Sequence, residues 1–182
     1  MSLERATAAV RLTVGVAALV LTLVPIALHA ATTQESALIP ELEILRPFLG
    51  SWDGALDVDP DHVWQRRSWI PILKGQAIRD TRAVPEADFE AEAIVFFDRE
   101  EGVVSYIGIT DNGYVTRGEI TFEGGEFMQM GDQIMPDGVM RTTRTTCRFM
   151  DDGTMIERFW SLEDDEWQAG HSIIYMPTLG DD

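Results

Sequence analysis

The chain has 182 residues, and its 31 acidic residues against 14 basic ones give a net charge of −17. So acidic a surface repels the phosphates of nucleic acids and anionic lipid headgroups, which excludes nucleic acid as a partner. The length is that of one domain with its own core. Because Cys147 is the only cysteine, we exclude a disulfide framework and a thiolate metal cluster, and we predict no metal site.

The first thirty residues have the layout of an export signal. Arg5 and Arg11 precede an uncharged apolar run at 12–28, and small residues follow this run at 29–31. This pattern predicts a secretory signal peptide over residues 1–30. An uncleaved N-terminal anchor is the alternative, because a run of this length is at the lower limit for crossing a bilayer. Either reading predicts a periplasmic or secreted protein that meets the membrane only through an uncleaved segment.

A short helix is expected after a polar linker. Pro40 suits the first helical position, and Pro47 and Gly50 end the segment. Leucines recur through it at helical spacing: Leu38, Leu42, Leu45 and Leu49. A helix this short is marginal alone, so its leucine stripe must pack on another element.

From Gly50 onward the hydrophobic pattern has a period of two. The predicted strands are 50–58, 62–70, 75–84, 89–98, 103–110, 113–122, 125–132, 139–150, 154–162 and 166–176. Turn sequences rich in Gly, Asn and Asp separate most of them, as at 111–113 and 151–153. The pattern predicts a mainly β fold, an antiparallel up-and-down meander closed into a barrel of about eight to ten strands after one short N-terminal helix. The expected division is a signal peptide or anchor at 1–30, a linker at 31–37, the barrel at 38–177 and a tail at 178–182.

Alternation along the strands assigns the faces that point inward. Strand 89–98 presents Phe89, Ala91, Ala93, Val95 and Phe97. Strand 113–122 presents Tyr114, Thr116, Gly118, Ile120 and Phe122. Strand 154–162 presents Ile156, Arg158, Trp160 and Leu162, and strand 166–176 presents Trp167, Ala169, His171, Ile173 and Tyr175. Small and polar members of these faces leave unfilled room, which favours an interior cavity.

The stretch that opens the barrel resembles a known family. It reads Leu42, Leu45, Phe48, Leu49, Gly50, Trp52 and Gly54. A short helix followed by Gly-x-Trp on the first strand resembles the lipocalin-like (calycin) barrels, and residues 42–177 are most similar to bacterial lipocalin-like domains of unknown function. Nitrobindin-like haem barrels begin similarly. The resemblance implies that Trp52 packs against an arginine from a late strand, with Arg158 expected before Arg148.

The leading hypothesis is an exported barrel that holds a small apolar or amphipathic molecule in its interior, with no cofactor. The side chains expected to contact this ligand are Trp64, Tyr114, Arg144, Arg158, Trp160, His171 and Tyr175. Arg144 and Arg148 share one face of strand 139–150, and an outward position for that face is the alternative to an inward one. The sequence assigns no catalytic residue.

Three other functions stay open. In a calycin-type isomerase, hydratase or cyclase, His171 or Tyr114 would act as acid or base in the same cavity. In a haem barrel, His171 would be the axial ligand of the iron. A filled barrel with a structural or partner-binding role is the third.

Overall fold

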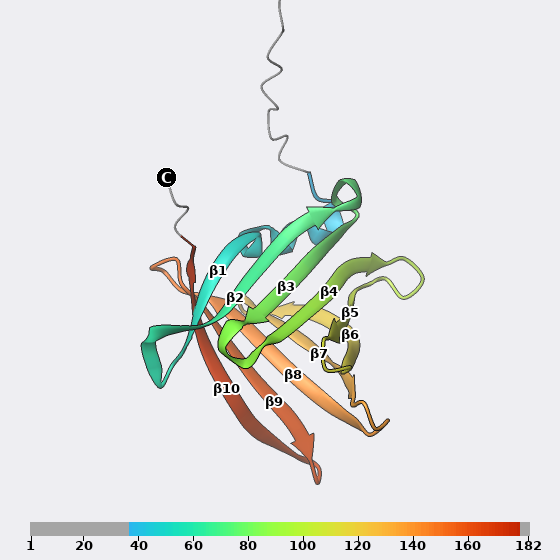
Figure 1. Cartoon of the computed structure of the whole chain (residues 1–182). Helices are drawn as coiled ribbons and strands as arrows, with labels where there is room; N and C mark the ends of the chain where they lie inside the picture. Colours follow the sequence, from blue (N-terminus) through green and yellow to red (C-terminus); the bar gives the residue numbers. More distant parts are fainter. Residues whose placement is uncertain (1–36, 179–182) are drawn as a thin grey trace, which may run out of the picture. The chain divides into compact units, whose positions relative to one another are not determined.

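The computed structural model of the chain describes residues 37–178. In this range the protein is a closed barrel of ten antiparallel strands that follows a single short helical segment (Figure 1). The predicted fold class is confirmed. The segment expected to direct export, with most of the linker and the tail, lies outside the described residues.

The elements follow the chain in order. They are η1 (Pro40–Phe48), β1 (Gly50–Leu56), β2 (Asp59–Ile72), η2 (Leu73–Gly75), β3 (Ala77–Val84), η3 (Pro85–Ala87), β4 (Phe89–Asp98), β5 (Val103–Thr110), β6 (Val115–Glu123), β7 (Glu126–Ile134), β8 (Met140–Phe149), β9 (Met155–Glu163) and β10 (Glu166–Pro177). None of the helices between residues 37 and 178 is long and apolar enough to cross a membrane.

Every strand pairs with its neighbours in sequence, and β1 pairs with β10 to close the barrel. In this last pairing Trp52 lies opposite Pro177 and Leu56 lies opposite Ile173. Short turns make the sequential pairing possible. In the β8–β9 turn, Gly153 has a φ of +83°, which costs a glycine little, and Asp152 accepts the backbone N–H of Thr154.

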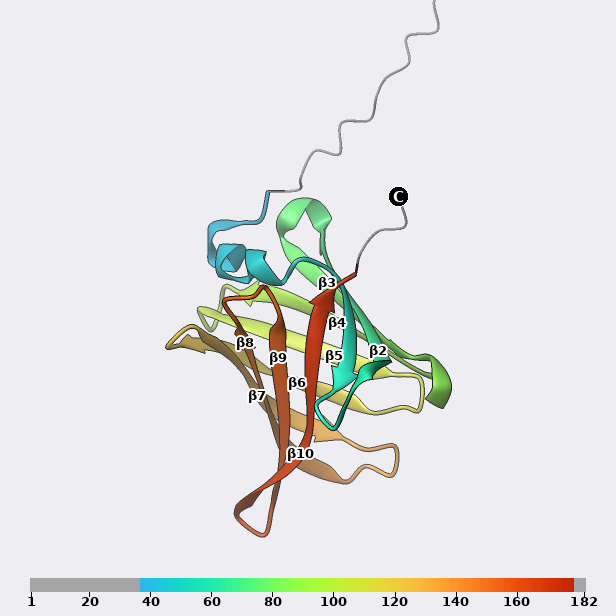
Figure 2. The ribbon, with the colours of Figure 1, turned by 90° about the vertical axis from the view of Figure 1, so that its left-hand side faces the viewer.

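One end of the barrel is closed by η1, a 3-10 helix (Figure 2). Leu42, Leu45 and Phe48 are spaced by three, which places them on one face of a helix with three residues per turn, and all three are buried. The Phe48 ring meets the Phe127 ring edge to face at 4.9 Å. This packing explains why so short a segment is ordered.

Trp52, the tryptophan of the Gly-x-Trp motif, holds the helix in place. Its indole N–H donates a hydrogen bond of 3.0 Å to the carbonyl of Phe48, one of the oxygens that a helix end leaves without a partner. The prediction that Arg158 packs on Trp52 is wrong, because Arg158 lies on the outer face of β9. Within the described barrel, the arginine that stacks on the core aromatics is Arg67 of β2, 4.9 Å from the centre of the Trp69 ring.

Candidate functional site

A cavity of about 630 Å³ lies inside the barrel, toward the end opposite η1. It combines aromatic, small and polar side chains that alternate inward along most of the strands. Its wall includes Trp64, Ala91, Ala93, Tyr106, Gly108, Thr116, Gln129, Gln133, Arg141, Thr143, Thr145, Phe159 and His171. Asp80, Arg82 and Glu157 form its floor.

The floor is built on a buried arginine. Arg67 has a side chain that is 0% exposed, and its guanidinium binds Asp80 through two hydrogen bonds of 2.8 Å each. The same guanidinium donates to Glu157 at 2.5 Å. Asp80 and Glu157 are 3% and 1% exposed, so each buried charge has a partner of opposite sign, as burial of ions requires.

Arg82 completes the floor on the cavity side. Its nitrogens lie 3.2 Å from Asp80 and 3.7 Å from Glu157, contacts that are longer than those of Arg67. Burial alone would raise the pKa of Glu157. The charges of Arg82 and Arg67 outweigh that effect and lower its pKa to about 2. Glu157 is therefore ionised at neutral pH, and the two arginines balance the two acids of the floor in formal charge.

Two ionisable side chains below the charged floor, Cys147 and Tyr175, are not reactive nucleophiles. Burial raises the pKa of Cys147 well above its ordinary value, and the charge of Glu157 acts in the same direction. Burial likewise raises the pKa of Tyr175, whose hydroxyl donates a hydrogen bond to Gln65. Both groups stay protonated at neutral pH, so the floor serves as a satisfied polar layer between the core and the cavity.

Two β-bulges turn aromatic side chains into the mouth. In β2, Gly54 pairs with Gln65 and Ala55 pairs with Val63, which leaves Trp64 as the extra residue. In β10, two residues, one of them His171, face a single residue of β9. Bulges re-aim side chains in this way beside binding sites. The Trp64 and His171 rings consequently lie 5.9 Å apart.

His171 also stacks on Phe159, with ring centres 5.2 Å apart and an angle of 6° between the planes. The neighbouring Gly170 allows this arrangement, since a Cβ there would lie 2.7 Å from the Phe159 ring. Desolvation lowers the pKa of His171; Glu157 opposes this effect and Arg82 adds to it. The imidazole is thus neutral at pH 7 and forms part of an aromatic wall.

The opposite wall carries hydrogen-bonding groups. Burial raises the pKa of Tyr106 to about 12, although a hydrogen bond with Gln129 pulls it down. Farther toward the mouth, Arg141 donates from Nε to the side-chain oxygen of Gln133 at 2.8 Å. Within residues 37–178, no three His, Cys, Asp or Glu side chains gather in a way that could hold a metal ion.

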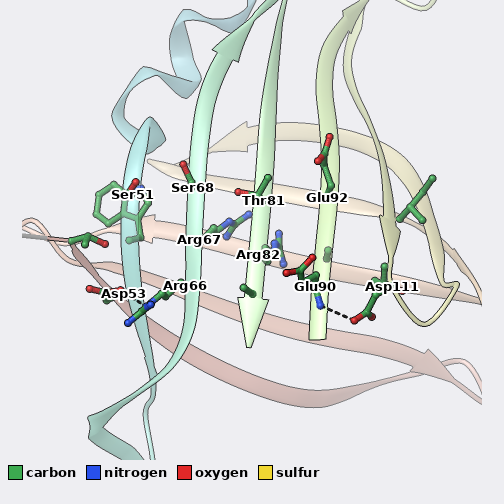
Figure 3. Close-up of a pocket in the computed structure, with 16 residues that line it drawn as sticks. Ser51, Asp53, Arg66, Arg67, Ser68, Thr81, Arg82, Glu90, Glu92 and Asp111 are labelled. Carbon is green, nitrogen blue, oxygen red and sulfur yellow. Dashed lines mark hydrogen bonds and ion pairs between the residues drawn. The ribbon is translucent and has the colours of Figure 1, made fainter. Parts of the chain in front are cut away.

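A second hollow, of about 960 Å³, lies on the outside of the barrel (Figure 3). Ser68, Thr81 and Glu92 line it from β2, β3 and β4. These positions alternate with inward-facing ones, so most of the lining belongs to the outer sheet surface. Trp52 and Arg67, which are nearly buried, border the hollow between the strands. One aromatic side chain, Trp52, lines this hollow, whereas the inner cavity is lined by several, among them Trp64, Tyr106 and Phe159. We therefore place the candidate site inside the barrel.

The structure places only some of the residues predicted to bind the ligand at the cavity. Trp64 and His171 line the cavity, and Tyr175 lies in the core beneath it. Tyr114 precedes β6 and is not part of the cavity wall. Arg144 and Trp160 are paired across β8 and β9 on the outer face.

The inward face predicted for strand 154–162 is wrong. Glu157 and Cys147 pair across β9 and β8 and are both buried inside, so Arg158 and Trp160 point outward. The outer side chains pack on one another instead. The Arg144 guanidinium lies 4.6 Å from the ring centres of both Trp160 and Trp167, which explains why an outer face carries so much aromatic surface. Trp167 and Ala169, also predicted to point inward, are placed outside by the β10 bulge.

Sequence reasoning missed most of the polar interior. Alternation alone does not assign Arg67 and Glu157 to the interior, and it names no role for Arg141. A signal was present, because Arg67 lies between Gln65 and Trp69 at spacings of two, and Glu157 lies between Met155 and Phe159 in the same way. A charged residue in phase with buried ones can mark an internal ion pair.

No model of a known protein family matches the sequence, and the search of curated proteins gives no match either. The cavity and its lining residues are thus the observations from which a function is inferred.

Proposed function

We propose that this protein is an exported, lipocalin-like barrel that binds one small amphipathic molecule in its interior. The observation that carries the proposal is a cavity of about 630 Å³ with both aromatic and hydrogen-bonding walls. Binding pockets for small molecules fall in this size range and combine apolar surface with a few placed polar groups. A barrel of this strand number is wide enough to hold such a ligand.

Small side chains keep the interior open. Ala93 and Gly108 face each other across β4 and β5, and a Cβ at Gly108 would lie 3.2 Å from that of Ala93. Ala91 adds a third small side chain to the same wall. Larger residues at these positions would fill the space, so the choice of Ala and Gly supports a binding role over a filled structural barrel.

An amphipathic ligand fits the lining better than a purely apolar one. Thr116, Gln129, Thr143 and Thr145 contribute hydroxyl and amide groups to the wall. An apolar ligand would strip these groups of water without replacing their hydrogen bonds, which costs free energy. A molecule with polar and apolar parts satisfies both kinds of wall.

The haem and enzyme alternatives have less support. His171 is flanked by Phe159 and Trp64, and the polar walls do not match the apolar faces of a haem macrocycle. The floor acids Asp80 and Glu157 are held by arginines. Within the described cavity, no hydrogen bond or ion pair joins either acid to His171, so this histidine is not paired with a carboxylate for proton transfer.

Ligand binding is tested with two variants of matched size. Native mass spectrometry of the purified protein should reveal a bound small molecule, and a fluorescent fatty acid should bind and be displaced by competitors. Ala91→Phe places a bulky ring in the cavity. Ala83→Phe makes the same change on the outer face of β3. We expect at least ~10-fold weaker probe binding in the first variant and unchanged binding in the second.

Two results would count against the proposal. One is the absence of both a bound molecule and probe binding in the wild-type protein. The other is equal probe affinity for Ala91→Phe and Ala83→Phe, which would place the probe outside the barrel.

A further inference from the structure

The inward-pointing charged residues that line the cavity and its floor sum to the opposite sign of the net charge of the chain. Asp80 and Glu157 are the acids of the floor, whereas Arg67, Arg82 and Arg141 are the arginines of the floor and wall. With His171 neutral, this set carries one positive charge, in a chain whose net charge is −17. Glu92 borders the cavity but alternates with Ala91 and Ala93, so its carboxylate lies outside.

The unmatched charge belongs to Arg141. Its Nε donates to Gln133, and among the described residues its two terminal nitrogens make no hydrogen bond and no ion pair. The β8–β9 register, continued from Thr143 and Ser161, places Glu163 opposite Arg141. Glu163 is exposed and accepts a hydrogen bond from Ser161, and among the described residues no ion pair joins it to Arg141. Arg141 therefore presents a preoriented pair of donor nitrogens at the cavity wall.

Arg82 is a poorer anchor for a ligand. Its guanidinium already faces Asp80 and Glu157, and moving it toward a ligand would weaken the pairing of two buried acids. Gln133 holds Arg141 through a neutral oxygen at 2.8 Å, so a second partner on its terminal nitrogens breaks no ion pair.

The aromatic wall lies at a defined distance from Arg141. Phe159 pairs with Thr145, which is four residues from Arg141 on β8, or about 13 Å along the strand. His171 stacks on Phe159 at that level, and Trp64 lies beside it. A ligand that reaches both features has a charged group at one end and a flat apolar body at the other.

We propose that the cavity selects carboxylates with a compact aromatic body, with the carboxylate bound by the terminal nitrogens of Arg141 and the ring placed against Trp64, Phe159 and His171. The inference rests on the proposed function and names its ligand class. An arginine binds both oxygens of a carboxylate at once, and such charge-assisted hydrogen bonds are roughly twice as strong as neutral ones. The acidic outer surface does not attract anions, so any preference for a carboxylate must come from the residues of the cavity.

The test compares each acid with its own amide. Benzoate, 2-naphthoate and 4-phenylbutyrate are titrated into the full chain by calorimetry, beside benzamide, 2-naphthamide and 4-phenylbutanamide. We expect at least one of the acids to bind about 10- to 100-fold more tightly than its amide. The amide keeps the shape of the acid, so the ratio reports the charge alone.

Two arginines of the same strand supply the matched variants. Arg141→Gln should reduce the acid-to-amide ratio to within about threefold. Arg148→Gln removes the same charge from the exposed outer face of β8 and should leave the ratio unchanged. Arg141→Lys, which keeps the charge and loses the paired donors, should give an intermediate ratio, and circular dichroism checks that each variant is folded.

Equal binding of acids and amides to the wild-type protein would overturn the inference and leave the proposed function standing. A ratio that persists in Arg141→Gln would equally overturn the role of Arg141. If no acid and no amide binds, the inference fails, and native mass spectrometry of the purified protein then decides the proposed function separately.

Discussion

Replacing Arg67 with methionine removes the partner of two buried acids. The change eliminates hydrogen bonds of 2.8, 2.8 and 2.5 Å to Asp80 and Glu157, and the acids are at most 3% exposed. Loss of one partner from a buried ion pair costs about 3–5 kcal/mol, a large share of the 5–15 kcal/mol that holds a typical domain together. We expect Tm to fall by about 6–20 °C.

The effect of this substitution should depend on pH. In the wild-type protein, the pKa of Glu157 is about 2, below its ordinary value of 4.5. A carboxyl with a lowered pKa stabilises the fold above pH 4.5, and this contribution is lost as the pH falls toward 2. Without Arg67 the pKa of Glu157 rises, so protonation at lower pH removes the poorly paired buried charge and makes the variant less unstable. The stability difference between the two proteins should narrow from pH 7 to pH 4.

Urea unfolding followed by tryptophan fluorescence measures both effects. Arg66→Met is the control, because the Arg66 side chain is 71% exposed and lies 3.7 Å from Asp53; surface pairs of this kind contribute about 0–1 kcal/mol. A loss below 1 kcal/mol in Arg67→Met, or a loss that is the same at pH 4 and pH 7, would show that Arg67 does not neutralise the two buried acids.

Three further outcomes are expected. Gly118→Ala should lower the free energy of unfolding by about 1–3 kcal/mol, because its Cβ would lie 2.1 Å from the backbone oxygen of Met130. Urea titration measures this change. An unchanged free energy of unfolding would mean that β6 and β7 move apart at no cost. Phe48→Ala should lower it by about 3–5 kcal/mol through loss of the packing on Phe127, and a cost below 1 kcal/mol would contradict the role of η1 as a lid. Cys147, which is 0% exposed and has a raised pKa, should react with an aromatic disulfide reagent only after denaturation; rapid reaction of the native protein would contradict its burial.

The strands were predictable because helical spacing of the apolar residues ends before Gly50 and a period of two begins there. The predicted 89–98 and 103–110 coincide with β4 and β5. Glycine and aspartate at turns such as 151–153 set the boundaries, since few other residues accept the backbone angles there. The leucine stripe at 42 and 45 likewise predicted a helix, although its spacing continues to Phe48 as a 3-10 helix rather than to Leu49.

The interior was less predictable because alternation identifies two faces without saying which one is buried. On β9 the face with Ile156 and Trp160 looks more apolar than the one with Glu157. The structure buries Glu157, because arginines from distant strands neutralise it. On β10, a bulge before Ser172 places Trp167 outside and His171 inside. An alternating pattern with a period of two reveals neither long-range ion pairs nor bulges.

A crystal structure of the protein grown with 2-naphthoate would locate the ligand relative to Arg141 and the aromatic wall. We predict electron density for one molecule inside the barrel, with its carboxylate at the terminal nitrogens of Arg141 and its rings beside Phe159 and His171. Density confined to the outer hollow near Ser68 and Thr81, or an interior closed by rearranged side chains, would contradict the account.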